Sequence, residues 1–317
     1  MNRFVICVAL LGLLPAAAGA NETISDWMGR SATFVEGKAD SGGVAISYHV
    51  AGEGPLVIFV HSIFGPWFDF RHQMVALSET HRVVSMSTRG TDRSDKPEGV
   101  EHYASARIAD DINALIDHFG EEMATIVGQD SGGLHAWHFA MTHPERTAGL
   151  ISLGSVHPAG LIRELIDNEA QQQSTQFQNN MLQNPQAGEQ LSGFIGGGQM
   201  NPDDPADVAE LRRDAYSRLE VESIVNFYKA NWPRPPVTAD TVGFGFKLGE
   251  FPPVQAPTLF IYGEDSGPFK PETLNNMWQW VDGPLTIQVL PGVGHGPHTE
   301  APEFVTPRIV EWLTTGR

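Results

Sequence analysis

A glycine-flanked aspartate, Asp130, is the residue of this chain best suited to do covalent chemistry. It occupies the serine position of the G-x-S-x-G nucleophile elbow, in the run Gly128-Gln129-Asp130-Ser131-Gly132. This elbow is a sharp strand-to-helix turn, and its glycines avoid collisions with the strand and the helix. A carboxylate on such a turn can attack carbon and form an ester that water then hydrolyses. The alternative is a structural aspartate that caps the following helix.

The elements around Asp130 predict an α/β fold. Apolar, strand-like runs occupy residues 57–60, 83–86, 124–127, 150–153, 258–262 and 286–290. Between them, residues 105–119 carry apolar side chains at helical spacing, and residues 133–142 form the helix that leaves the elbow. Continuous apolar strands that alternate with helices indicate a mainly parallel, doubly wound sheet covered on both faces.

The alternation stops between residues 157 and 253. This stretch is rich in glutamine and mainly helical, and it lies between the strand that ends at Leu153 and the strand that begins at Thr258. We expect a helical cap over residues 157–253, inserted into a core domain made of residues 30–156 and 254–317.

The first twenty residues have the form of a secretory signal peptide. Arg3 precedes an apolar stretch over residues 4–14, and Ala18-Gly-Ala20 has the small-x-small form of a cleavage site. The stretch is too short for a comfortable membrane anchor. The only cysteine, Cys7, lies within it. We therefore expect cleavage near Ala20 and a secreted or periplasmic mature protein without disulfides.

Composition excludes several classes of partner. The chain has 317 residues, of which 20 are basic and 38 acidic, for a formal net charge of −18. This balance argues against nucleic acid and anionic membranes. His135 and His138 share a helix but lack an acid or a third histidine at helical spacing, so we expect packing histidines and no metal. No cofactor motif is present, which leaves a small-molecule substrate as the expected partner.

Further motifs, in the same order along the chain, resemble the α/β-hydrolase superfamily, in its epoxide hydrolase and dehalogenase branch with an Asp nucleophile. The run 89–97 is similar to the R-G-x-G-x-S-x-K-P loop, and Gly154-Ser-Val-His-Pro158 is similar to the N-x-P-H-P turn. Asn226-Phe-Tyr-Lys-Ala-Asn231 is similar to the cap motif N-x-Y-R-A. Gly292-Val-Gly-His295 resembles the turn that carries the catalytic histidine. The resemblance implies an α/β-hydrolase fold.

The resemblance also implies the roles of individual residues. Asp130 would attack an electrophilic carbon, and His295 would activate the water that hydrolyses the ester. The backbone N–H groups of Ile63 and Ser131 would hold the oxyanion. For an epoxide, Tyr228 would protonate the departing oxygen. The imidazole also needs an orienting carboxylate, for which Asp265 is the candidate and its neighbour Glu264 the competitor.

Several positions differ from the family pattern. His61-Ser-Ile-Phe64 replaces the H-G-x-P oxyanion motif, and Ser131 replaces a tryptophan that helps to hold halide in dehalogenases. In Gly263-Glu-Asp-Ser266, an ungapped alignment puts Ser266 at the acid position and moves the carboxylate to Asp265. The slot of the first cap tyrosine falls at Ser174 or Thr175.

The sequence thus favours an exported hydrolase that opens an apolar epoxide, or a related electrophile, through an Asp130 ester. Three alternatives stay open. One is a haloalkane-type dehalogenase, a second is a lactone or ester hydrolase, and the third is a catalytically impaired homologue that binds small molecules.

Overall fold

A central β-sheet organises the protein, whose computed structural model describes residues 21–196 and 204–315. The predicted signal peptide, residues 1–20, lies outside the described residues. The strands are β1 (Asn21–Ser25), β2 (Ser31–Ser41), β3 (Val44–Ala51), β4 (Leu56–Val60), β5 (Arg82–Met86), β6 (Ala124–Gln129), β7 (Thr147–Leu153), β8 (Thr258–Gly263) and β9 (Leu285–Leu290). Within the described ranges they form one nine-stranded sheet in the order β1-β2-β3-β5-β4-β6-β7-β8-β9.

The sheet is mainly parallel, as the sequence predicts. Strands β4 to β9 pair in parallel, whereas β1, β2 and β3 form antiparallel pairs and β3 joins β5 in antiparallel fashion. The six predicted strands correspond to β4 through β9. The antiparallel edge was not predicted, and it begins at Asn21, earlier than the expected start of the core at residue 30.

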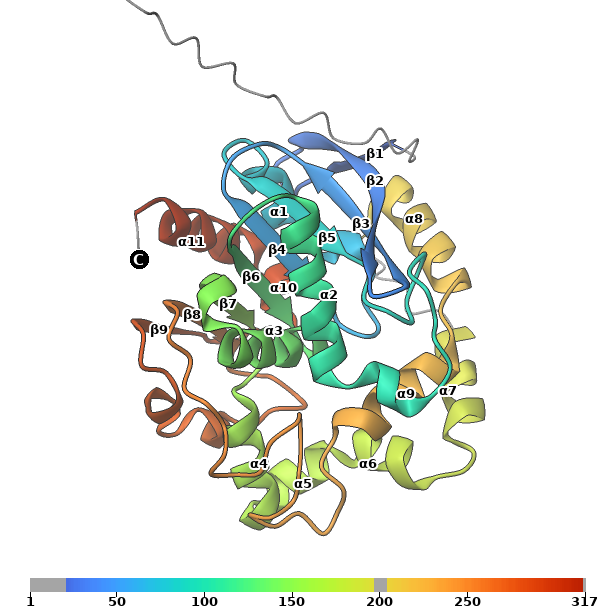
Figure 1. Ribbon diagram of the computed structural model, residues 1–317, viewed down its shortest axis with the longest axis vertical. Coiled ribbons are helices and arrows are strands. Elements are labelled where there is room, and N and C mark those ends of the chain that lie inside the picture. The colour runs from blue at the N-terminus through green and yellow to red at the C-terminus, as the bar shows by residue number, and fades with distance from the viewer. Residues whose placement is uncertain (1–20, 197–203, 316–317) are drawn as a thin grey trace, which may run out of the picture.

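Helices cover both faces of the sheet (Figure 1). Those around the sheet are α1 (Arg71–Leu77), α2 (Ser105–His118), α3 (Ser131–Thr142), α10 (Pro297–Glu300) and α11 (Pro302–Thr314). Helices α2 and α3 pack together on one face, and α1, α10 and α11 pack on the other. Five short 3-10 helices are described: Trp67–Phe70, Val100–Tyr103, Pro144–Arg146, Pro271–Leu274 and Met277–Trp280. No helix in the described part of the chain is long and apolar enough to cross a membrane.

Alternation along the strands creates two apolar layers. In β4, Ile58 belongs to the layer that contains Trp137 of α3, while Val57 and Phe59 belong to the layer that contains Trp312 of α11. All of these side chains are buried. Successive side chains of a strand point to opposite faces, so a strand buried on both sides must be apolar throughout. This requirement explains the continuous apolar runs of the sequence.

A group of helices lies between β7 and β8 in the chain. Its members are α4 (Pro158–Asp167), α5 (Glu169–Ser174), α6 (Gln176–Gln183), α7 (Ala187–Gly196), α8 (Ala206–Ser217) and α9 (Val221–Asn231). In Figure 1, α4, α5 and α6 lie at the bottom, α7 and α9 at the lower right, and α8 at the upper right, level with β3. We refer to residues 157–253 as the cap, within which 197–203 are outside the described ranges.

Ion pairs join the cap to the sheet domain. Arg212 of α8 donates to Asp69 of the sheet domain at 2.9 Å, and to Asp204 within the cap at 2.6 Å. Arg218, just after α8, donates to Asp92 at 2.7 Å. Asp92 has φ 42° and stands at the second glycine position of the R-G-x-G loop. An aspartate tolerates this left-handed conformation better than most residues, and here its carboxylate anchors the cap.

Candidate active site

Asp130 sits on a strained turn between β6 and α3. Its φ of 50° and ψ of −123° lie outside the regions that L-residues ordinarily adopt. A Cβ on Gly128 would lie 2.6 Å from the Gly132 carbonyl oxygen, and a Cβ on Gly132 would collide with the Val60 carbonyl. The turn therefore requires both glycines. It has the geometry of the predicted elbow, in which backbone strain is retained at a functional position.

The turn brings the carboxylate of Asp130 to the imidazole of His295. Asp130 Oδ1 lies 3.2 Å from His295 Nε2, and Ser62 Oγ donates to Asp130 Oδ2 at 2.6 Å. Burial works against the ionised carboxylate, but the bonds from His295, Ser62 and the Ser131 N–H outweigh it and hold the pKa of Asp130 below its ordinary value. The side chains of Asp130 and His295 are 23% and 26% exposed, so both are accessible to solvent.

The second imidazole nitrogen of His295, Nδ1, lies next to the hydroxyl of Ser266. His295 Nδ1 lies 3.3 Å from Ser266 Oγ, whereas Asp265 and Glu264 are exposed and make no hydrogen bond to His295 within the described residues. The expectation that Asp265 orients the imidazole is therefore not met. The turn after β8 is closed by a bond from Ser266 N–H to the Gly263 carbonyl, and it presents position 266 to the imidazole.

The residues directly after β7, Gly154 and Ser155, offer no carboxylate to the imidazole either. Gly154 has φ 67°, and any Cβ there would collide with the carbonyl of His295. Gln129 Nε2 donates to the same carbonyl at 3.4 Å. The loop that carries His295 thus packs directly against Gly154, which explains why this position has no side chain.

The predicted oxyanion donors are only partly in place. The Ser131 N–H bonds the Asp130 carboxylate, but the Ile63 N–H donates to Ser131 Oγ at 2.6 Å. His61 holds this loop, since its Nε2 accepts from the Thr88 N–H at 3.3 Å and its Nδ1 donates to the Ser62 carbonyl at 2.6 Å. The contacts of the Ser62 and Ser131 hydroxyls were not predicted, although both residues depart from the family motif.

Tyr228 lies on cap helix α9 and is buried. Burial, and then the negative charge of Asp130, raises the pKa of its phenol, so the hydroxyl stays protonated. Within the described residues the hydroxyl has no hydrogen-bond partner. The ring of Tyr228 packs against that of Phe177, with the ring centroids 5.9 Å apart. The ring of Phe177 in turn packs against that of Phe64, with the centroids 6.0 Å apart. Tyr228 is therefore an unengaged proton donor among aromatic side chains.

The two candidates for the first cap tyrosine slot are engaged elsewhere. Ser174 Oγ donates to the carbonyls of Gln171 and Pro268, at 2.9 Å and 3.1 Å. Thr175 Oγ1 donates to the carbonyls of Gln171 and Gln172, at 3.0 Å and 3.1 Å. Neither hydroxyl is available as a second donor for ring opening.

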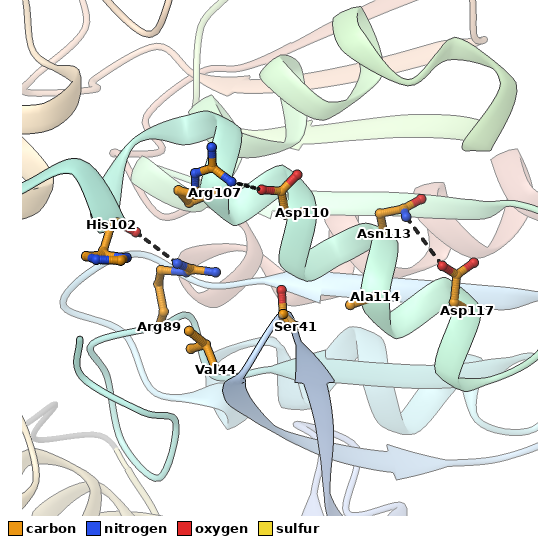
Figure 2. Close-up of a pocket in the computed structure, with 10 residues that line it drawn as sticks. Ser41, Val44, Arg89, His102, Arg107, Asp110, Asn113, Ala114 and Asp117 are labelled. Atoms are coloured by element: carbon orange, nitrogen blue, oxygen red, sulfur yellow. Dashed lines mark hydrogen bonds and ion pairs between the residues drawn. The ribbon is translucent and has the colours of Figure 1, made fainter.

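A cavity of about 410 Å³ lies apart from these residues, between α2 and the turn after β2 (Figure 2). The one buried cation that lines it, Arg89, makes two bonds to Asp111, at 2.6 Å and 2.8 Å, and one to the His102 carbonyl. The guanidinium of Arg89 is therefore committed to these partners and is not free to bind a ligand in the cavity. Nor do the described residues contain a cluster of three metal-ligating side chains.

Comparisons with known proteins identify the family of this fold. A family model described as alpha/beta hydrolase fold matches residues 55–302. An AB hydrolase superfamily protein of Bacillus subtilis is 38% identical over 118 residues, which cover 36% of this chain and 41% of that protein. Epoxide hydrolase 3 of Xenopus tropicalis is 25% identical over 284 residues, which cover 86% of this chain and 75% of that protein.

Solved structures extend the comparison. An epoxide hydrolase from metagenomes of hot environments matches with a TM-score of 0.76 and 26% identity, over 89% of this chain and 99% of that one. The Bacillus megaterium epoxide hydrolase in complex with an inhibitor matches with a TM-score of 0.73 and 24% identity, over 87% and 99% of the two chains. The chain therefore belongs to the α/β-hydrolase fold family, in its epoxide hydrolase-like branch.

Proposed function

We propose that this protein hydrolyses apolar epoxides through an ester intermediate on Asp130. The observation that carries the proposal is the position of the Asp130 carboxylate, which sits on the strained elbow with Oδ1 3.2 Å from His295 Nε2. Epoxide hydrolases from other organisms, similar over most of this chain, support the substrate class. The aromatic side chains of Phe64, Phe177 and Tyr228 favour an apolar substrate.

In the first step, Asp130 Oδ1 attacks a ring carbon of the epoxide. The carbon–oxygen bond of the ring breaks, and its electron pair stays on the ring oxygen. An alkoxide is a poor leaving group unless it is protonated. The Tyr228 hydroxyl supplies the proton, because it is protonated and otherwise unpaired.

In the second step, His295 Nε2 removes a proton from water, and the water oxygen attacks Cγ of the ester. The carbonyl electron pair moves to Oδ2, where hydrogen-bond donors stabilise the oxyanion. When the tetrahedral intermediate collapses, the bond from Cγ to the original Oδ1 breaks. The diol leaves with that oxygen and takes the proton that His295 holds. The second proton of the water passes from the new carboxyl group to the Tyr228 phenolate, so that Asp130 regains a carboxylate with one oxygen from water.

The alternatives are less well supported. A dehalogenase would lack the halide-holding tryptophan, because Ser131 stands there and its hydroxyl accepts from the Ile63 N–H. Lactone or ester hydrolysis needs no ring-opening donor such as Tyr228. A catalytically impaired binding protein is favoured by one observation, which is that a serine, Ser266, faces His295 Nδ1 in place of a carboxylate.

Diol formation from a panel of apolar epoxides tests the proposal. Wild-type protein should hydrolyse at least one member, and Asp130→Ser should abolish turnover while keeping a wild-type circular dichroism spectrum. Near-normal turnover by that variant would exclude the mechanism. Tight binding of epoxides without turnover, by wild type itself, would favour the binding protein.

We also propose that the protein is exported and cleaved near Ala20. The charged start, the apolar stretch and the small-x-small site support this. N-terminal sequencing of protein recovered outside the cytoplasm should begin near Asn21. Recovery of all the protein in the cytoplasm with Met1 retained would contradict export.

A further inference from the structure

The loop after β4 contains a hydroxyl that takes part in the site. Ser62 stands where the family motif has glycine, and its Oγ accepts a bond from the Phe64 N–H at 3.3 Å. The same Oγ lies 2.6 Å from Asp130 Oδ2. An ionised carboxylate can only accept hydrogen bonds. The Ser62 hydroxyl must therefore donate its proton to Asp130 Oδ2.

The neighbouring backbone donor is diverted from this oxygen. The Ile63 N–H, which belongs to the oxyanion site by family geometry, donates to Ser131 Oγ at 2.6 Å. Ser131 is itself the residue that replaces tryptophan. Two serines thus change the donor set around Asp130. Ser131 accepts the hydrogen bond of the Ile63 N–H, and Ser62 supplies a side-chain hydroxyl.

We propose that the Ser62 hydroxyl is a catalytic oxyanion donor, which acts with the Ser131 N–H in place of the Ile63 N–H. This inference rests on the proposed ester mechanism. Because Oδ1 faces His295 and forms the bond to substrate, Oδ2 remains as the ester carbonyl oxygen. When water attacks Cγ and His295 takes its proton, the carbonyl pair moves to Oδ2, which Ser62 stabilises. On collapse the pair returns to the carbonyl, the Cγ–O bond to the product breaks, and the product oxygen takes the proton from His295.

This role predicts opposite effects on the two chemical steps. A hydrogen bond to the free carboxylate stabilises its charge and makes it a weaker nucleophile. The same bond stabilises the oxyanion during ester hydrolysis, where one lost donor costs about 10²–10³ in rate. Ser62→Ala should therefore form the Asp130 adduct at least as fast as wild type, and hydrolyse it about 10²–10³ times more slowly.

Rapid-quench kinetics with intact-protein mass detection, using a hydrolysed epoxide as the probe, measures both steps. In the steady state, Ser62→Ala should carry a larger fraction of adduct than wild type. Adding Ser131→Ala should restore part of the hydrolysis rate, at least about tenfold, because the Ile63 N–H is then free to reach Oδ2. A purely structural role for Ser62 would lower both rates together, and the second substitution would not restore either.

Two results would overturn the role of Ser62. One is hydrolysis of the Ser62→Ala adduct within about threefold of wild type, well below the loss of one oxyanion donor. The other is a parallel fall of both steps in a variant that melts at the wild-type temperature. Failure of the ester mechanism looks different, since no adduct would form in wild type, in Ser62→Ala or in a variant that lacks the His295 base.

Discussion

Ser266 Oγ lies 3.3 Å from Nδ1 of His295, at the place where the catalytic histidine of a triad is normally held by a carboxylate. A carboxylate accepts only, and so fixes the proton on Nδ1 and leaves Nε2 free to act as a base. A serine hydroxyl can donate or accept, so it permits both tautomers. It also carries no charge with which to stabilise the imidazolium. Ester hydrolysis should therefore be the slow step in this protein.

Restoring the carboxylate should accelerate that step. We expect Ser266→Asp to raise the rate of ester hydrolysis at least about tenfold, since loss of the triad aspartate from a serine protease costs about 10⁴ in rate. Single-turnover decay of the Asp130 adduct measures the effect. The matched control is Asp265→Asn, which changes an exposed neighbour and should alter the decay rate less than about twofold, a small effect beside that of a triad acid. A large loss in the Asp265 variant would return the orienting role to that residue.

Tyr228→Phe separates epoxide chemistry from halide chemistry. The substitution keeps the ring against Phe177 and deletes only the hydroxyl. We expect adduct formation with an epoxide to fall by about two to four orders of magnitude. With any alkyl halide that the protein accepts, the rate of adduct formation should fall little, because a halide ion departs without a proton. An epoxide rate within about threefold of wild type, inside the smallest effect of a general acid, would reduce Tyr228 to a packing residue.

His49 should make the protein less stable in acid. It stacks on Trp67 with ring centroids 3.7 Å apart. Burial, and then the charges of Arg93 and Arg218, lowers the pKa of His49 from 6.5 to about 3. The folded state keeps the ring neutral, whereas the unfolded chain takes up a proton as the pH falls below about 6.5. The stability contribution is thus full above that pH and is lost as the pH falls towards 3.

The His49→Phe variant tests this linkage, because phenylalanine keeps the stack and cannot titrate. Between pH 7 and pH 5, its free energy of unfolding should fall by about 2 kcal/mol less than that of wild type. Denaturant titrations at the two pH values measure the difference. An equal fall in both proteins would show that His49 takes up its proton in the folded state as readily as in the unfolded chain.

The central sheet could be predicted because burial on both faces leaves a continuous apolar run, as in β4 and β6. The antiparallel edge could not be. The strand β2, residues Ser31–Ser41, contains many polar residues, and buried positions are mixed with exposed ones along it. Its pairing with β1 and β3 holds it in the sheet. Such pairing depends on which strands lie side by side in space, and the pattern along the chain does not show this directly.

The contact between Asp130 and His295 could also be expected, because each residue occupies a turn with a recognisable glycine pattern. The sequence could not decide whether Asp265 or its neighbour Ser266 lies next to Nδ1 of His295. A bond from the Ser266 N–H to the Gly263 carbonyl shapes this turn and places Ser266 there. The contact of Ser62 with Asp130 joins residues far apart in the chain. This contact depends on the positions of two side chains to within about 1 Å. The spacing of motifs along the chain does not determine such positions.

The covalent nucleophile is the central claim, and the mass of a trapped ester tests it most directly. His295→Gln should remove the base that activates water and leave Asp130 free to attack. After incubation with an epoxide that wild type hydrolyses, the intact variant should gain the mass of one epoxide, and peptide mapping should place it on Asp130. An unmodified variant, or one labelled at another residue while Asp130 stays free, would contradict the mechanism.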